Sequence, residues 1–158
     1  MKSLLKTILV GAVLAAAGVA MAAGAADPVV GTWNLNIPKS TFDPGPALKT
    51  QTRTYTVDKD GTSLSVSGVA ADGSAVSQKA TFKYDGKSYP FTGSADFDAL
   101  SLKRINGSTV KSTLMKAGKK VGTATRTVSG GGKLLTLSTK VTGADGKVHT
   151  TVLVFDKQ

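Results

Sequence analysis

The feature that most constrains the fold of this 158-residue chain is a regular series of glycine-containing turn signals. Asp-Gly and Asn-Gly between β-prone segments are typical of tight hairpins, because both central residues of a type I′ turn need positive φ. Successive signals lie mostly 11 to 15 residues apart, which predicts strands of about 8 to 10 residues. The seven signals are Asp60-Gly61, Asp72-Gly73, Asp85-Gly86, Asn106-Gly107, Gly118, the glycines at 130–132 and Asp145-Gly146.

The segments between these signals alternate apolar and polar residues with a period of two. In TRTYTV, the residues Arg53, Tyr55 and Val57 share one face, and the threonines share the other. The same alternation places Phe82 and Leu102 on the apolar faces of later segments. A period of two filled with Thr, Val and Ser predicts half-buried antiparallel strands. No comparable helical period follows residue 27, so the sequence predicts an all-β fold.

The short, nearly uniform connections favour a closed barrel over a sandwich. About nine or ten strands joined by tight turns form an up-and-down meander, whereas a Greek-key sandwich needs a long crossover. The one long interval, between Gly86 and Gly107, carries an extra bend in SYPFTGSADFDAL. An outer-membrane barrel is not favoured, because the outward face carries residues such as Ser63, Lys79 and Thr81 instead of a continuous apolar belt.

Residues 1–26 have the composition of a secretory signal peptide. Lys2 and Lys6 precede an uncharged apolar run, and the sites ending at Ala22 and Ala26 both fit small-x-small cleavage. The chain contains no cysteine, which excludes lipid attachment to an N-terminal cysteine and any support from disulfides. We therefore expect one mature domain over 27–158 that is periplasmic or secreted and is not a lipoprotein.

The predicted mature domain is strongly basic. Without Lys2 and Lys6 it has 18 basic and 10 acidic residues, a net charge of +8, and 15 of the basic residues are lysines spread along the chain. Export and this even spread argue against nucleic acid as a partner. Lysines at turns and strand edges favour solubility and block edge pairing, and they would also attract the domain to an anionic envelope surface.

Few residues could carry catalysis or bind a metal. The chain has no glutamate, and most of its aspartates lie at predicted turns, where their backbone preferences explain them. His149 is the only histidine, with no cysteine or second histidine to share a metal. An enzyme would need His149 clustered with Asp96 or Asp156, which no spacing indicates. The sequence therefore predicts no enzyme, no catalytic residue, no metal and no cofactor.

The start of the predicted domain resembles a known superfamily. Gly31-Thr32-Trp33 in GTWNLN is similar to the Gly-x-Trp of the first strand of lipocalins and their calycin relatives. The segments YDGKSYPFTG, SLKRING and VLVFDKQ resemble small exported bacterial proteins of lipocalin-like or fatty-acid-binding-like type, most without an assigned function. The resemblance implies a lipocalin-like barrel of about eight to ten strands around a cavity for a small apolar or amphipathic molecule.

Two features depart from these families. Lipocalins usually place an arginine near the last strand to pack on the first-strand tryptophan, yet no arginine follows Arg126. The Arg and Tyr with which fatty-acid-binding barrels hold a carboxylate are also absent from HTTVLVFDKQ. The resemblance therefore predicts the barrel geometry of these families for this chain, but it does not assign their ligand-contacting residues to positions in this sequence.

Arginines on apolar strand faces are the most informative candidates. A guanidinium there is costly unless it meets an acid or reaches solvent. Inside a barrel, Arg53 is a candidate to hold either the polar head of a ligand or a buried aspartate, and Arg104, close to a turn, can reach the barrel mouth. The face of Arg126 is ambiguous, because Val121 and Val128 fall on opposite sides. The candidate ligand-binding residues are Arg53, Tyr55, Phe82, Leu102 and Arg104. Trp33 is predicted to form the barrel floor, and Leu35 and Ile37 are predicted to share the inward face of the first strand with it.

Two hypotheses for function remain open. The first is an exported monomeric barrel that binds a small hydrophobic or amphipathic ligand non-covalently. The alternative is an envelope interaction module, an inhibitor or stress-related protein, that acts through its basic surface and has a filled interior. The size and lining of the barrel interior discriminate between them.

Overall fold

The computed structural model describes residues 26–158. Residues 1–25, which are all but the last residue of the predicted signal peptide, lie outside this range. The described chain is almost entirely β-structure. No helix within it is long and apolar enough to cross a membrane. The strands are β1 (Gly31–Leu35), β2 (Thr41–Asp43), β3 (Thr50–Asp58), β4 (Gly61–Val69), β5 (Ala75–Phe82), β6 (Asp85–Thr92), β7 (Ala99–Arg104), β8 (Thr109–Lys116), β9 (Lys119–Ser129), β10 (Leu134–Thr142) and β11 (Val148–Lys157), with 3₁₀ segments η1 (Ile37–Lys39) and η2 (Gly130–Gly132).

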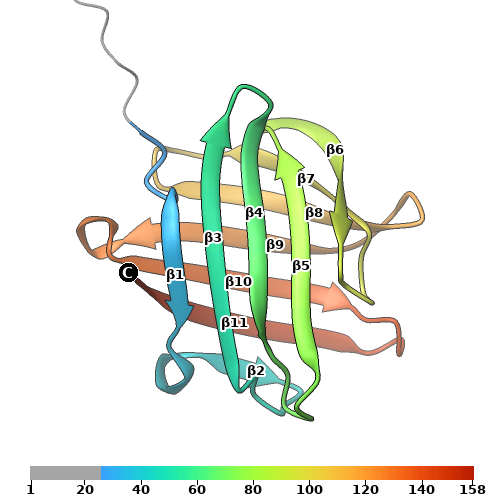
Figure 1. The fold of residues 1–158 in the computed structure, drawn as a ribbon. Helices are drawn as coiled ribbons and strands as arrows, with labels where there is room; N and C mark the ends of the chain where they lie inside the picture. The colour runs from blue at the N-terminus through green and yellow to red at the C-terminus, as the bar shows by residue number, and fades with distance from the viewer. Residues whose placement is uncertain (1–25) are drawn as a thin grey trace, which may run out of the picture.

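The strands form a closed antiparallel barrel. From β3 to β11 each strand pairs with the next one, β1 pairs with β3, and β1 also pairs with β11 to close a ring of ten strands. In Figure 1, β3, β4 and β5 run in front and cross the strands β7 to β11 behind them, so two walls face each other across the interior. The predicted all-β meander closed into a barrel is confirmed.

The chain between β1 and β3 leaves the ring and then continues along β11. Asn36 accepts a hydrogen bond from the Lys39 amide, and Pro38 occupies the first turn of η1. This turn rotates Ile37 outward, where it is 36% exposed, so the prediction that Ile37 shares the inward face of Trp33 is wrong. After η1, the strand β2 pairs with residues 150–152 of β11, and among the strands of residues 26–158 it alone lies outside the ring of ten.

A β-bulge in β9 explains why the face of Arg126 is ambiguous in the sequence. The register shifts between Leu114 and Met115 of β8, so that Gly122 and Lys120 face consecutive residues of the partner and Val121 is the extra residue. The bulge reverses the alternation on one side of Val121. Val121 and Val128 therefore both pack against the core, and Arg126 points inward.

One end of the barrel, here called the closed end, is filled by side chains. Trp33 is fully buried there with Phe155 and Leu135, and its indole Nε1 donates a hydrogen bond to the Val29 carbonyl at 2.7 Å. The Lys157 ammonium lies 5.0 Å from the centre of the Trp33 ring. A last-strand lysine thus occupies the place where the lipocalin resemblance implies an arginine.

Candidate functional site

A cavity of about 360 Å³ lies between the closed end and the opposite end of the barrel, here called the mouth. Every strand except β1 contributes to its lining, together with the chain at 44–48 and 94–97. A volume of this order is large enough for a small organic molecule. The lining residues are Phe42, Pro44, Pro46, Leu48, Gln51, Arg53, Tyr55, Leu64, Val76, Gln78, Phe82, Phe91, Ser94, Asp96, Phe97, Leu100, Leu102, Ser112, Leu114, Ala124, Arg126, Leu137, Thr139, Val141, His149, Thr151 and Leu153.

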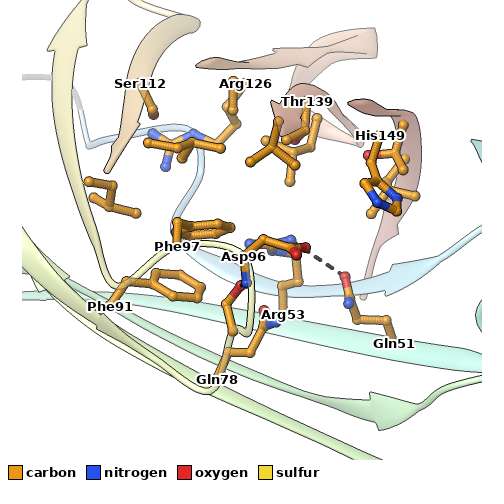
Figure 2. Close-up of a pocket in the computed structure, with 18 of the residues that line it drawn as sticks. Gln51, Arg53, Gln78, Phe91, Asp96, Phe97, Ser112, Arg126, Thr139 and His149 are labelled. Carbon is orange, nitrogen blue, oxygen red and sulfur yellow. Dashed lines mark hydrogen bonds between the residues drawn. The ribbon is translucent and has the colours of Figure 1, made fainter. Parts of the chain in front are cut away.

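Arg53 on β3 is a buried cation in one wall of this cavity. It is 7% exposed, and its Nη1 donates a long hydrogen bond of 3.4 Å to the neutral Gln51 Oε1 (Figure 2). Its guanidinium carbon lies 5.6 Å from the centre of the Phe155 ring. Within residues 26–158, its Nε has no hydrogen-bond partner and no carboxylate pairs with it. A buried charge in this state destabilises the fold.

Arg126 on β9 is a second buried cation, contributed by the other wall. It is 6% exposed, and its Nη2 donates to the Tyr84 hydroxyl at 2.7 Å. The guanidinium lies over the rings of Tyr55 and Tyr84, at 5.1 and 5.5 Å from their centres. Burial by itself lowers the pKa of Arg126, but Tyr55, Tyr84 and Asp27 together raise the pKa, so the group stays protonated. Its Nε also lacks a partner in the described chain.

Behind Arg126, Asp27 joins three groups at the closed end. Its Oδ2 accepts hydrogen bonds from the Tyr84 hydroxyl at 2.7 Å and from Arg104 Nη2 at 2.8 Å, and its Oδ1 accepts one from the Val29 amide at 3.1 Å. Arg104 also stacks on the Tyr84 ring, with 4.2 Å between the guanidinium carbon and the ring centre. Asp27 therefore neutralises Arg104 and fixes the segment before β1 to the barrel.

The Asp27 carboxyl makes the stability of the barrel depend on pH. Burial raises its pKa, but the hydrogen bonds from Tyr84, Arg104 and Val29 outweigh burial and hold the pKa below its ordinary value of 3.8. A pKa that is lower in the folded state stabilises the fold above the unfolded-state pKa, and this stabilisation is lost as the pH falls below 3.8 and through the lower folded-state pKa. We expect the free energy of unfolding of the wild type to exceed that of Asp27→Asn at pH 6 and the difference to shrink by pH 3. Urea unfolding at both pH values measures this, and a difference that does not change with pH would contradict it.

The polar groups that the sequence associates with catalysis lie at both ends of the barrel: His149 and Asp96 line the cavity at the mouth, and Asp156 lies near the closed end. The Nε2 of His149 contacts Asp145 Oδ1 at 3.0 Å, while Asp96 Oδ1 accepts the Ala144 amide at 3.0 Å. Asp156 hydrogen-bonds with Asn36 instead. The described chain contains no group of three or more His, Cys, Asp or Glu side chains that could hold a metal.

The structure brings most of the predicted ligand-binding residues together. Arg53, Tyr55, Phe82 and Leu102 all line the cavity. Arg104 does not line it, because its guanidinium turns to Asp27 at the closed end. Trp33 lies at the closed end and is not a lining residue either. Whether any of the lining residues contacts a ligand stays a prediction.

Sequence reasoning left several polar lining residues out. Figure 2 shows Gln51, Arg53 and Gln78 on one side of the cavity and Ser112, Arg126 and Thr139 on the other, with Phe91 and Phe97 between them. Gln51 shares the parity of Arg53 on β3, so extending the alternation by one position would have found it. Arg126 shares the parity of Ala124 and Val128 on β9, and its face is ambiguous in the sequence only because the bulge gives Val121 the opposite parity.

Comparisons with known proteins show the fold. No family model matches the sequence, and no curated protein does. Among solved structures nine chains match, and one is the zebrafish ileal bile acid-binding protein complexed with cholic acid. This chain is similar to it with a TM-score of 0.50 and 15% identity, over 83% of this chain and 99% of the zebrafish protein. The fold is therefore that of a calycin-like barrel.

Proposed function

We propose that this barrel binds, non-covalently, a small amphipathic molecule that carries an anionic group. The observation that carries the proposal is the pair of buried arginines, Arg53 and Arg126, in a cavity whose walls are otherwise largely apolar. Both guanidiniums keep an Nε donor without a partner in the described chain. A carboxylate, sulfonate or sulfate would supply the missing acceptors and the missing negative charge.

The apolar part of the ligand would lie against the aromatic side of the cavity. Phe91 and Phe97 pack together with 4.6 Å between their ring centres, and Leu100 and Leu102 continue this surface along β7. Burial of the ligand against it supplies the apolar contribution to affinity. Cholic acid in the zebrafish barrel is an amphipathic carboxylic acid, so the same fold has been described with a ligand of this class.

The proposal includes export. The signal-peptide composition of residues 1–26 would deliver the domain to the periplasm or the medium, where a carrier or scavenger of amphipathic anions meets its ligands.

A fluorescence titration tests the proposed function. The purified protein is titrated with 1-anilinonaphthalene-8-sulfonate, and the bound probe is then displaced with decanoate or with decanamide, its neutral counterpart of equal size. We expect saturable binding of one probe and displacement by decanoate at a concentration at least about 10-fold lower than by decanamide, because a charge-assisted hydrogen bond contributes about 1.5–3 kcal/mol. Equal displacement by the two competitors would contradict an anionic ligand.

A protein that takes up no apolar probe would favour the second candidate, an envelope interaction module. The observation that favours this second candidate is that lysines lie opposite one another on neighbouring strands of the outer surface. Lys103 faces Lys111 across β7 and β8, and Lys116 faces Lys119 at the next turn. An acidic partner would relieve this repulsion. Salt-sensitive capture of such a partner, combined with failure of probe binding, would support this candidate.

A further inference from the structure

We infer that Tyr84 is a positioning residue whose hydroxyl stands between Arg126 and Asp27 and keeps the Arg126 guanidinium available to the cavity. This inference rests on the proposed function, because it concerns how the barrel presents one of its two cations. Tyr84 is not itself a lining residue. It would therefore control ligand preference without touching the ligand.

The Tyr84 hydroxyl links Arg126 to Asp27 through two consecutive hydrogen bonds. It accepts a hydrogen bond from Arg126 Nη2 at 2.7 Å and donates one to Asp27 Oδ2 at 2.7 Å. Asp27 forms an ion pair with Arg104 and forms none with Arg126 within 4.0 Å. Arg126 is thus close enough to Asp27 for electrostatic attraction but is held one hydroxyl away from it.

This separation determines whether Arg126 forms an ion pair with Asp27 or remains available to an anionic ligand. An arginine in direct contact with a buried carboxylate forms a paired group whose charge is largely compensated, and it is then a poor anion site. With the tyrosine in place, only Nη2 is engaged by a hydrogen bond, to a neutral oxygen, and Nε has no partner in the described chain. The guanidinium therefore keeps its positive charge, and its residue lines the cavity.

Removal of the hydroxyl is expected to let Asp27 capture Arg126. In Tyr84→Phe the ring remains, and so can its edge-to-face contact with Phe82, at 5.8 Å between ring centres. The guanidinium would then turn toward the Asp27 carboxylate, which already acts on it electrostatically. The cavity would lose one of its two cations without any change in a residue that lines it.

The experiment measures the ratio of decanoate affinity to decanamide affinity, from displacement of the fluorescent sulfonate probe. We expect Tyr84→Phe to lower this ratio at least about fivefold, and the double variant Tyr84→Phe/Asp27→Asn to restore it, because a neutral amide no longer competes for Arg126. Asp27→Asn alone should keep or raise the ratio. A purely structural role of Tyr84 would weaken both competitors alike and leave the ratio unchanged.

The chain offers a matched control for this experiment. The Tyr89 hydroxyl donates to Asp85 Oδ2 at 2.8 Å, a second Tyr–Asp pair of which neither member lines the cavity. Tyr89→Phe and Asp85→Asn should each leave the ratio of decanoate affinity to decanamide affinity within twofold of the wild-type value, a difference of about 0.4 kcal/mol.

Each outcome decides a different point. A wild type that prefers decanoate, with the same preference in Tyr84→Phe, overturns the inference and leaves the proposed function standing. A wild type without any preference overturns the proposed function itself. If Tyr84→Phe fails to fold, Asp27→Asn decides alone, since a lower ratio in that variant means that Asp27 supports Arg126 instead of competing for it.

Discussion

Replacement of Arg53 by methionine is expected to make the barrel more stable and a poorer receptor for anions. Arg53 is buried with a single long hydrogen bond to a neutral amide and no carboxylate partner in the described chain. Replacing buried charged groups by well-packed apolar residues of similar volume is neutral or stabilises a protein by about 1–4 kcal/mol, and Arg53 lacks the compensation that a carboxylate partner would give. The same change removes a charge-assisted contact, so decanoate affinity should fall about 10- to 100-fold while decanamide affinity changes little.

Urea unfolding and probe displacement on one preparation measure both effects of Arg53→Met. Lys103→Met is the control, because Lys103 is an exposed lysine that does not line the cavity, so it removes the same unit of charge from the outer surface. The control should change neither stability nor the preference for decanoate by a comparable amount. A less stable Arg53→Met barrel with unchanged decanoate affinity would mean that Arg53 serves the fold and not a ligand.

Replacement of Trp33 by alanine is expected to cost about 3–5 kcal/mol of unfolding free energy. Trp33 is 0% exposed, and it carries the hydrogen bond to Val29 that holds the segment before β1 against the closed end. Alanine would leave a cavity in the part of the barrel that side chains fill. Urea unfolding measures the loss, and Trp33→Phe should lose much less because the aromatic ring still fills the site.

Val57→Ala provides the comparison for Trp33→Ala. Val57 shares the alternation of Arg53 and Tyr55 in the sequence but lies beyond the closed end of the barrel, 56% exposed. Its truncation should change stability by less than about 0.5 kcal/mol. A small effect at Trp33 as well would mean that the closed end is loosely packed and that Trp33 does not serve as its floor.

The architecture could be predicted because its determinants are local. Each turn signal acts on the two or three residues around it, and the alternation between signals fixes which face of a strand is buried. Strand parity therefore placed Arg53, Tyr55, Phe82 and Leu102 correctly on the inward face. Closure of the ring followed from the number of strands and the short connections.

The polar network at the closed end could not be predicted, because its contacts join distant parts of the chain. Asp27 meets Tyr84 across 57 residues and Arg104 across 77 residues, and no spacing rule connects such positions. Strand parity placed Arg104 on the inward face, but the last residue of a strand is free to turn to a nearby carboxylate. The turn of Ile37 and the bulge at Val121 are local interruptions of the alternation, which counting by twos along the strand does not detect, although Asn36, Pro38 and Gly122 mark them.

The most direct test of the central claim observes the arginine side chains themselves. The chain has three arginines, Arg53, Arg104 and Arg126, so their Nε–H signals in a ¹⁵N NMR spectrum are few and can be assigned by substitution. On titration with decanoate, we predict that the Nε–H signals of Arg53 and Arg126 shift and saturate together at one ligand per protein, while that of Arg104, paired with Asp27, remains in place. Saturable binding of decanoate that moves neither cavity arginine would contradict the account.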